Sequence, residues 1–286
     1  MTDDTQDRDD SGVGPPVWAP RLEDPRLVWW LMGLAFVIGL PSIGLGLLAD
    51  DHIHRLILLK DWPYAIEPQP LLHLFSFIPG STIGLEPLRD MGILPWNADP
   101  ELSATFFRPV SVLTHMADYA LWPDVYWLQH LHSRLWYALS VGAAFLCFRR
   151  FGLPLASAGL AGLMFTVEEA HGLNMGWLAN RNASLALIFG MAAMYLHHRF
   201  RSERRGTILM AGVVCFVLSM FSAEAGVGAL AYIVAWELTM EEGSWLRRAL
   251  AIVPYLLVLL GWLIVYKTLG YGVIWSDIYL DPGNQP

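Results

Sequence analysis

Two adjacent carboxylates and a histidine, Asp50-Asp51-His52, directly follow a long apolar run. A carboxylate in such a position can act as a general base toward a hydroxyl group, and two carboxylates together can bind a divalent cation such as Mg²⁺ or Mn²⁺. Asp50 and Asp51 are therefore candidates both for the base and for metal ligands, and the sequence does not choose between them. The simpler interpretation is a hydrophilic stop at the end of a helix.

Two arginines lie close to other apolar runs and are candidates for binding a phosphate group. Arg108 precedes the second run, and Arg181 closes the connection at 168–182. The guanidinium fork donates paired hydrogen bonds to phosphate oxygens, although Arg108 could instead reach out to lipid headgroups. Further candidates for substrate contact or for support of the site are His52, Asp118, Glu168, Glu169, His171, Trp177, Asn180 and Glu224.

These side chains must be positioned by apolar segments with the character of membrane spans. Hydrophobic residues make up 55% of the 286 residues and charged residues only 15%, compared with about 25% charged in a soluble domain. Seven candidate spans are predicted, at 27–48, 127–147, 153–167, 183–198, 207–222, 225–239 and 249–269. The fold class is therefore all-α, a polytopic transmembrane bundle of about seven helices.

Composition also excludes several classes of protein. A formal net charge of −8 provides no basic surface for nucleic acid. Cys147 and Cys215 both lie in apolar runs, and the spacing of Cys and His matches no zinc module or disulfide framework.

The basic residues predict the orientation. When the seven spans are followed alternately, one side receives eight arginines, whereas the short connections on the other side hold only Arg181. By the positive-inside rule the arginine-rich side is cytoplasmic, so the protein is predicted to lie in the inner (plasma) membrane with its N-terminus inside. The eight arginines are Arg149, Arg150, Arg199, Arg201, Arg204, Arg205, Arg247 and Arg248.

Three regions are predicted on this basis. Residues 1–26, acidic and then rich in Pro and Gly, form a disordered cytoplasmic tail. Residues 27–270 form the transmembrane module, whose long outer loop at 49–126 carries interfacial helices at 52–62 and 71–78 with their apolar faces in lipid. Residues 271–286 form an outer C-terminal segment, which we expect to be truncated relative to longer proteins of this kind.

Four segments, in this order, resemble motifs of the GT-C superfamily of membrane glycosyltransferases, in particular the bacterial relatives of protein O-mannosyltransferases and the O-mannosyltransferases with tetratricopeptide repeats. They are the acidic pair at Asp50, the stretch from Phe107 to Trp122, the group of His171, Trp177 and Arg181, and the hairpin around Glu224. Two positions depart from the family: Glu168-Glu169 replace a His-Pro pair, and Ala223 replaces a lysine.

The resemblance implies transfer of a sugar, hexosyl or mannosyl, from a polyprenyl-phosphate donor to an acceptor protein, lipid or glycan on the outer (periplasmic) face. It implies a base in the first outer loop, Asp50 or Asp51, and a leaving phosphate stabilised by Arg108 or Arg181. Two alternatives remain: a transporter or channel, and a non-catalytic membrane protein of the same fold.

Overall fold

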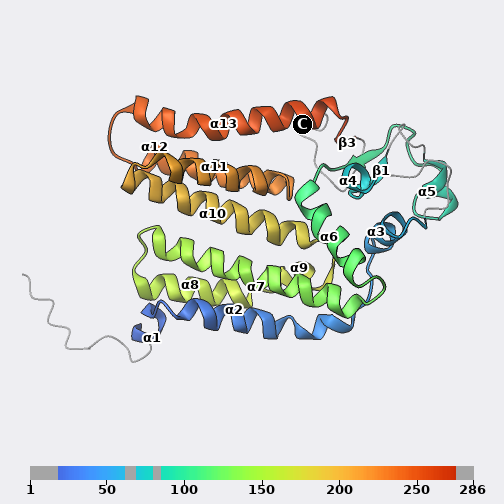
Figure 1. The fold of residues 1–286 in the computed structure, drawn as a ribbon, viewed down its shortest axis with the longest axis horizontal. Coiled ribbons are helices and arrows are strands. Elements are labelled where there is room, and N and C mark those ends of the chain that lie inside the picture. Colours follow the sequence, from blue (N-terminus) through green and yellow to red (C-terminus); the bar gives the residue numbers. More distant parts are fainter. Residues whose placement is uncertain (1–18, 62–68, 80–84, 275–286) are drawn as a thin grey trace, which may run out of the picture.

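The computed structural model describes residues 19–61, 69–79 and 85–274, and this part of the chain is mostly helical with one small sheet (Figure 1). The helices are α1 (Ala19–Glu23), α2 (Leu27–Ile38), η1 (Leu40–Gly44), α3 (Asp51–Leu58), α4 (Pro70–His73), α5 (Glu86–Asp90), α6 (Pro109–Leu121), α7 (Tyr126–Arg150), α8 (Leu155–Val167), η3 (Glu169–His171), α9 (Gly172–Gly176), α10 (Arg181–Glu203), α11 (Gly206–Met220), η4 (Glu224–Gly226), α12 (Val227–Thr239) and α13 (Trp245–Thr268). The strands are β1 (Ser76–Pro79), β2 (Ser103–Thr105) and β3 (Gly272–Ile274).

Each of the seven apolar runs contains an α-helix, although the run at 27–48 is divided into α2 and η1, and local chemistry sets the helix ends. Gly152, at φ +79°, supports the tight turn between α7 and α8, which Pro154 then helps to close. Arg204, at φ +57°, terminates α10 in the left-handed conformation typical of helix C-termini. Ser222 and Ala223 separate α11 from α12, as expected for a tight hairpin.

Helices α2, α7, α8, α10, α11, α12 and α13 run side by side as a bundle (Figure 1). On one side α2, α7 and α8 pack around Leu31, Tyr137 and Phe145, and on the other α10 to α13 pack around Phe216 and Tyr255. α7 and α10 contact each other and join the two halves. The bundle thus has two apolar cores linked along one central pair of helices.

Among the described residues, two helical segments are long and apolar enough to cross a membrane: Leu27–Gly44, with 18 residues, and Trp245–Thr268, with 24. Only 17% of each segment is buried within the protein, so most of its apolar surface points outward. The shorter α8 and α11 are also apolar. α7 and α10 are long but contain polar side chains directed into the bundle, such as Arg134 and Arg181.

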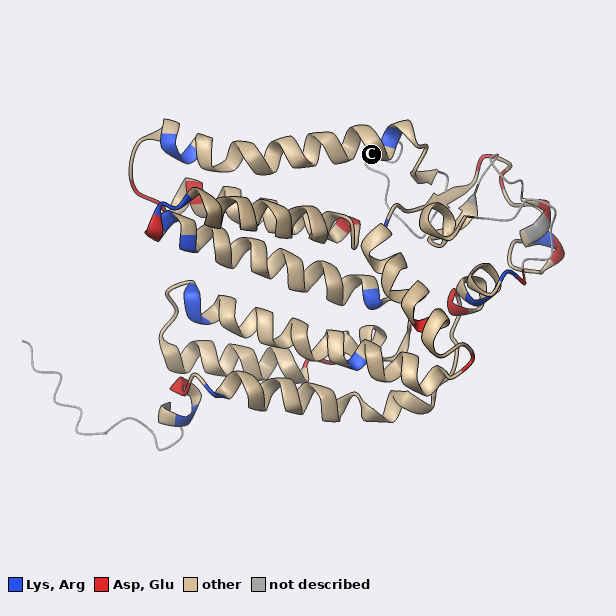
Figure 2. Cartoon of the chain, in the orientation of Figure 1, with Lys and Arg blue, Asp and Glu red and all other residues tan. Residues whose placement is uncertain are grey.

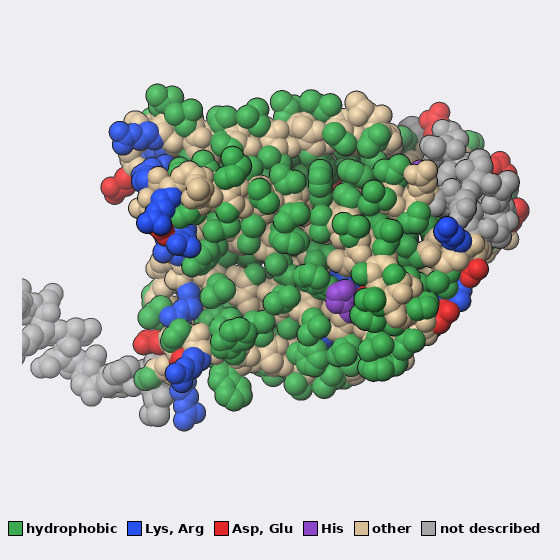
Figure 3. All heavy atoms as spheres, viewed as in Figure 1, with side chains coloured by type: hydrophobic (Ala, Val, Ile, Leu, Met, Phe, Trp, Pro, Cys, Tyr) green, Lys and Arg blue, Asp and Glu red, His purple; other side chains and the backbone are tan. Residues whose placement is uncertain are grey.

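Charge is sorted along the long axis of the bundle. Lysine and arginine side chains gather where α7 ends, α10 ends and α13 begins, and apolar side chains cover the middle of the visible face (Figures 2 and 3). We call the end of the bundle where these Lys and Arg side chains gather the basic end. It contains the eight arginines that the sequence predicted on one side.

The opposite end of the bundle carries a small domain, here called the cap, formed by the described residues of 51–121 and by β3. Its sheet has the order β1-β2-β3, all antiparallel, with Ser76 opposite Thr105 and Ala104 opposite Val273. The sheet therefore joins the first outer loop to the segment that follows α13.

The prediction that 52–62 and 71–78 lie flat in lipid is wrong for the described residues. Ile53 and Ile57 of α3 pack with Leu74, Phe75 and neighbouring residues in a core of the cap's own. Apolar side chains gain about 1.5–3 kcal/mol from leaving water, whether they enter lipid or a protein core. Periodicity alone cannot distinguish these two environments. Residues 62–68 lie outside the described residues.

The described end of the predicted tail also differs from expectation, because residues 19–23 form a helix, α1, docked on α8. The backbone of Leu22 lies so close to Gly159 that a Cβ at position 159 would be 2.3 Å from the Leu22 carbonyl oxygen. Arg149 donates a hydrogen bond to the Glu23 carbonyl at 2.8 Å. The close contact of Leu22 with Gly159 thus helps to hold α1 against α8, although the composition of residues 1–26 favours disorder. Residues 1–18 lie outside the described residues.

Candidate functional site at the cap end

An ion pair between Arg108 and Glu224 lies where the cap meets the bundle. Nε and Nη2 of Arg108 are 2.9 and 2.7 Å from the same oxygen, Oε2 of Glu224. The side chains are 14% and 28% exposed, so solutes can reach the pair from solvent. The guanidinium rests over Phe106, 4.3 Å from the ring centre, and over Phe75 at 5.1 Å.

Backbone contacts between α6 and the α11–α12 connection bring these two residues together. The Val110 amide donates to the Phe221 carbonyl at 3.0 Å, and the Ser111 hydroxyl donates to the Ser222 carbonyl at 2.8 Å. Pro109 begins α6, where its missing N–H is no loss, and Arg108 therefore occupies the N-cap position. These contacts hold Arg108 next to Glu224, although the two residues are 116 positions apart in the chain.

Tyr266 of α13 contacts the other oxygen of Glu224. Its hydroxyl lies 3.4 Å from Oε1 of Glu224 and 3.3 Å from the carbonyl oxygen of Thr105 in β2. The last long helix therefore contributes to the same site as the first outer loop.

Asp50 is half-buried immediately before α3, and no described residue donates a hydrogen bond to its carboxylate. Burial raises the pKa of Asp50, and the positive charge of Arg108 partly opposes this rise. Asp50 is thus a carboxylate with an increased proton affinity in the electrostatic field of the arginine, which are the properties required of a general base.

Asp51 has a different environment, although it is the next residue. Its carboxylate is 1% exposed and accepts backbone hydrogen bonds from Leu48 at 3.0 Å, Leu178 at 3.3 Å and Ala179 at 2.7 Å. Burial raises the pKa of Asp51 to about 6, against the effect of these hydrogen bonds. Asp51 therefore ties the start of the cap to the α9–α10 connection, and its oxygens are directed at amides.

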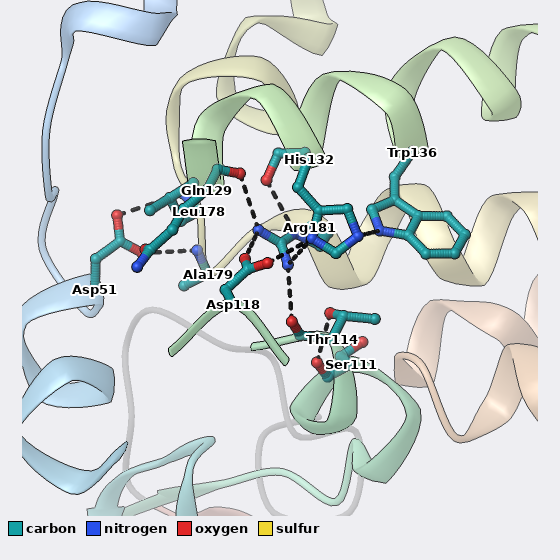
Figure 4. Close-up of polar contacts among 11 residues, drawn as sticks. Asp51, Ser111, Thr114, Asp118, Gln129, His132, Trp136, Leu178, Ala179 and Arg181 are labelled. Carbon is teal, nitrogen blue, oxygen red and sulfur yellow. Dashed lines mark hydrogen bonds and ion pairs between the residues drawn. The ribbon is translucent and has the colours of Figure 1, made fainter. Parts of the chain in front are cut away.

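Arg181 is enclosed in the bundle, and each of its nitrogens has a partner (Figure 4). Nε donates to Ser133 at 2.9 Å, Nη1 to the Thr114 carbonyl at 3.3 Å, and Nη2 to Asp118 Oδ2 at 2.5 Å and the Gln129 carbonyl at 3.2 Å. Asp118 is likewise fully buried. In this structure Arg181 joins α6, α7 and α10, and none of its nitrogens is directed toward Arg108 or Asp50.

His132 completes this buried network but is not free to act as a base. The indole N–H of Trp136 donates to Nε2 of His132 at 2.9 Å, so Nδ1 carries the ring proton and faces Asp118 Oδ1 at 2.5 Å (Figure 4). The pair resembles the Asp–His part of a catalytic triad, yet the nitrogen that would accept a proton is already occupied.

Two buried histidines, His54 and His115, flank Phe75, over which Arg108 also rests. His54, one helical turn after Asp50, has its ring 4.8 Å from that of Phe75 and 5.1 Å from that of His115. Burial lowers the pKa of His54 to about 3 and that of His115 well below its usual range, so both are neutral at pH 7. Sequence reasoning missed His54 and Phe75. Spacing could have indicated His54, because positions i and i+4 share a helix face.

The remaining predicted residues lie apart from the pair of Arg108 and Glu224. His52 is exposed on α3. Glu168 and Glu169 are exposed where α8 ends, and Glu168 caps η3 through the amide of Ala170. His171 Nδ1 lies 3.0 Å from the hydroxyl of Tyr137. Trp177 and Asn180 are half-buried, and Asn180 bonds to Asn174.

Among the described residues, no group of three or more His, Cys, Asp or Glu side chains could hold a metal ion. The candidate pair of Asp50 and Asp51 is divided, because the oxygens of Asp51 are occupied by the three amides. No family model matches the chain, nor does any curated protein or solved structure.

Proposed function

We propose that the protein is a multi-pass membrane glycosyltransferase of the GT-C type, which moves a sugar from a polyprenyl-phosphate donor to an acceptor on the outer face. The observation that carries the proposal is the half-buried Asp50 in the region of the accessible Arg108–Glu224 pair: His54, one helical turn after Asp50, packs on Phe75, over which Arg108 rests. The Asp50 carboxylate is suited to act as the base, and the Arg108 guanidinium is suited to bind the phosphate. The short sequence motifs resembling GT-C enzymes contribute these same residues.

The proposed membrane topology uses seven helices, α2, α7, α8, α10, α11, α12 and α13. The apolar side chains around the middle of the bundle face lipid, and the basic end faces the cytoplasm of the inner membrane. The cap then lies on the outer face, where lipid-linked sugars are used. The donor enters from the bilayer, so its phosphate reaches the protein at the level of Arg108.

The reaction proceeds as a single displacement. Asp50 accepts the proton of the acceptor hydroxyl while the hydroxyl oxygen forms a bond to the anomeric carbon. The bond from that carbon to the phosphate oxygen breaks, its electron pair remains on the phosphate, and Arg108 stabilises the added charge. Attack opposite the leaving group inverts the anomeric centre. Asp51 and Arg181 act by positioning: Asp51 fixes the start of α3 and Arg181 fixes α6.

A transporter receives less support from the buried charges. His197, Arg201, Glu237 and Glu241 form a cluster near the basic end, with Arg201 2.7 Å from Glu241 and 3.1 Å from Glu237. His197 bonds to the same oxygen of Glu237 at 2.8 Å. Charges paired with one another between α10 and the C-terminal end of α12 serve better as a structural tie than as an ion path.

Asp50→Asn tests the proposal in liposomes that contain a polyprenyl-phosphate-linked hexose. Loss of the base lowers the transfer rate by about 10²–10⁴-fold, while the thermal unfolding midpoint stays at the wild-type value. The matched control is Asp90→Asn, which makes the same change at an exposed position of α5. Full transfer by the Asp50 variant removes this residue from the mechanism, and absence of transfer by the wild type favours the non-catalytic alternative.

A further inference from the structure

The way Arg108 binds Glu224 leaves room for a competing anion. Nε and Nη2 of Arg108 both contact Oε2 of Glu224, whereas Oε1 faces the Tyr266 hydroxyl. An arginine and an oxyanion associate more strongly when two nitrogens meet two oxygens, an arrangement that a phosphate readily offers. The observed pair is therefore weaker than the pair that Arg108 can form with a phosphate.

We propose that Glu224 occupies the position of the donor phosphate in the free protein, and that the lipid-linked phosphate displaces it from Arg108. This inference rests on the glycosyltransferase function proposed above. It assigns to Glu224 a positioning role, as an internal competitor that holds the arginine until the donor arrives.

Displacement needs little movement. The pair is partly exposed, at 14% and 28%, so solvent screens part of the attraction between the two charges. Glu224 lies in η4, a three-residue turn between two helices, and Oε1 is already within 3.4 Å of the Tyr266 hydroxyl. Rotation of the carboxylate toward Tyr266 leaves Glu224 with a hydrogen-bond donor after Arg108 turns to the phosphate.

Competition by Glu224 also explains why Asp50 has no partner. The positive charge of Arg108 acts on Asp50, and a guanidinium without Glu224 would attract the Asp50 carboxylate more strongly. While Glu224 neutralises Arg108, this attraction is weakened, and once the phosphate binds, its own charge has the same effect. Asp50 is therefore kept available for the acceptor in both states.

The experiment measures binding of polyprenyl phosphate to the full chain in nanodiscs of neutral lipid. Glu224→Gln keeps the shape of the side chain and removes its charge, so it should bind polyprenyl phosphate about three- to tenfold more tightly than the wild type. Glu169→Gln is the matched control, because Glu169 is exposed at the cap end and has no contact with Arg108. Inorganic phosphate at the same concentrations should not compete, since the proposed ligand is the lipid-linked form.

Unchanged or weaker binding by Glu224→Gln, with clear binding by the wild type, overturns the competition and leaves the proposed function intact. Absence of polyprenyl phosphate binding by the wild type overturns both, and competition by inorganic phosphate overturns the lipid-linked ligand. If Glu224→Gln does not fold, Tyr266→Phe provides the test. It removes the hydroxyl that receives the displaced carboxylate, and should weaken binding about two- to fivefold.

Discussion

Replacement of Arg181 by methionine separates a structural arginine from a phosphate ligand. The variant removes the cation from an ion pair in which both side chains are at most 1% exposed. It leaves the Asp118 carboxylate buried without its principal partner, together with the carbonyls of Thr114 and Gln129. Breaking a buried pair from one side costs about 3–5 kcal/mol, and methionine restores much of the packing volume.

The expected result is a decrease in the thermal unfolding midpoint of roughly 6–20 °C, on the basis of about 2–4 °C per kcal/mol for a chain somewhat smaller than this one. Tryptophan fluorescence of the purified protein in detergent measures it. Arg247→Met is the matched control, since Arg247 is exposed at the basic end. A double variant, Arg181→Met with Asp118→Leu, should recover at least half of the loss, because no buried charge remains unpaired.

A different outcome would refute the reasoning. If Arg181→Met unfolds at the wild-type midpoint while the KM for the donor rises, then Arg181 leaves its network in the working protein and faces the donor. If the double variant is no more stable than the single one, the ion pair with Asp118 does not account for the loss.

Three further predictions concern separate parts of the protein. Because burial raises the pKa of Asp50, transfer should fall as the pH decreases through that pKa, at a pH above the ordinary carboxyl value of 3.8; a pH profile of the transfer rate in liposomes checks this. Burial raises the pKa of Asp51 to about 6, so the folded protein binds the Asp51 proton more tightly than the unfolded chain does. The stability that this proton contributes is full below pH 3.8 and is lost as the pH rises through about 6; the unfolding stability measured across this range should depend less on pH in Asp51→Asn. In Gly159→Val the added side chain collides with the backbone of Leu22, so α1 should leave α8, which accelerated proteolysis between residues 19 and 26 would report and an unchanged cleavage rate would contradict.

The helices of the bundle could be predicted because their apolar runs are long and bounded by clear breaks. The run at 153–167 corresponds to α8 at Leu155–Val167, and the break at Ser222 separates α11 from α12. The cap could not be predicted in the same way, because its strands contain three or four residues each and β2 pairs with β3, a strand 167 positions later in the chain. No local pattern indicates that Ala104 lies opposite Val273.

The candidate site was predictable in its residue types and less so in their roles. Asp50 and Glu224 were identified from their positions at the ends of apolar runs and Arg108 from the stretch that precedes the second run, and the structure places them in one region. Asp51 and Arg181 have the same residue types and similar positions. Apart from Leu48, however, their hydrogen-bond partners lie 48 to 128 residues away, so their burial follows from packing that spacing does not reveal.

The pairing of β2 with β3 also has a consequence for the order of biosynthesis. Thr105 and Gly272 are 167 positions apart, and Tyr266 reaches Glu224 from the last long helix. A nascent chain that has inserted only its first helices has neither the third strand nor the tyrosine, and loop closure over such a separation comes late in folding. The site around Arg108 is therefore completed only when α13 is in position, so under the proposed function an unfinished chain would lack a complete donor site.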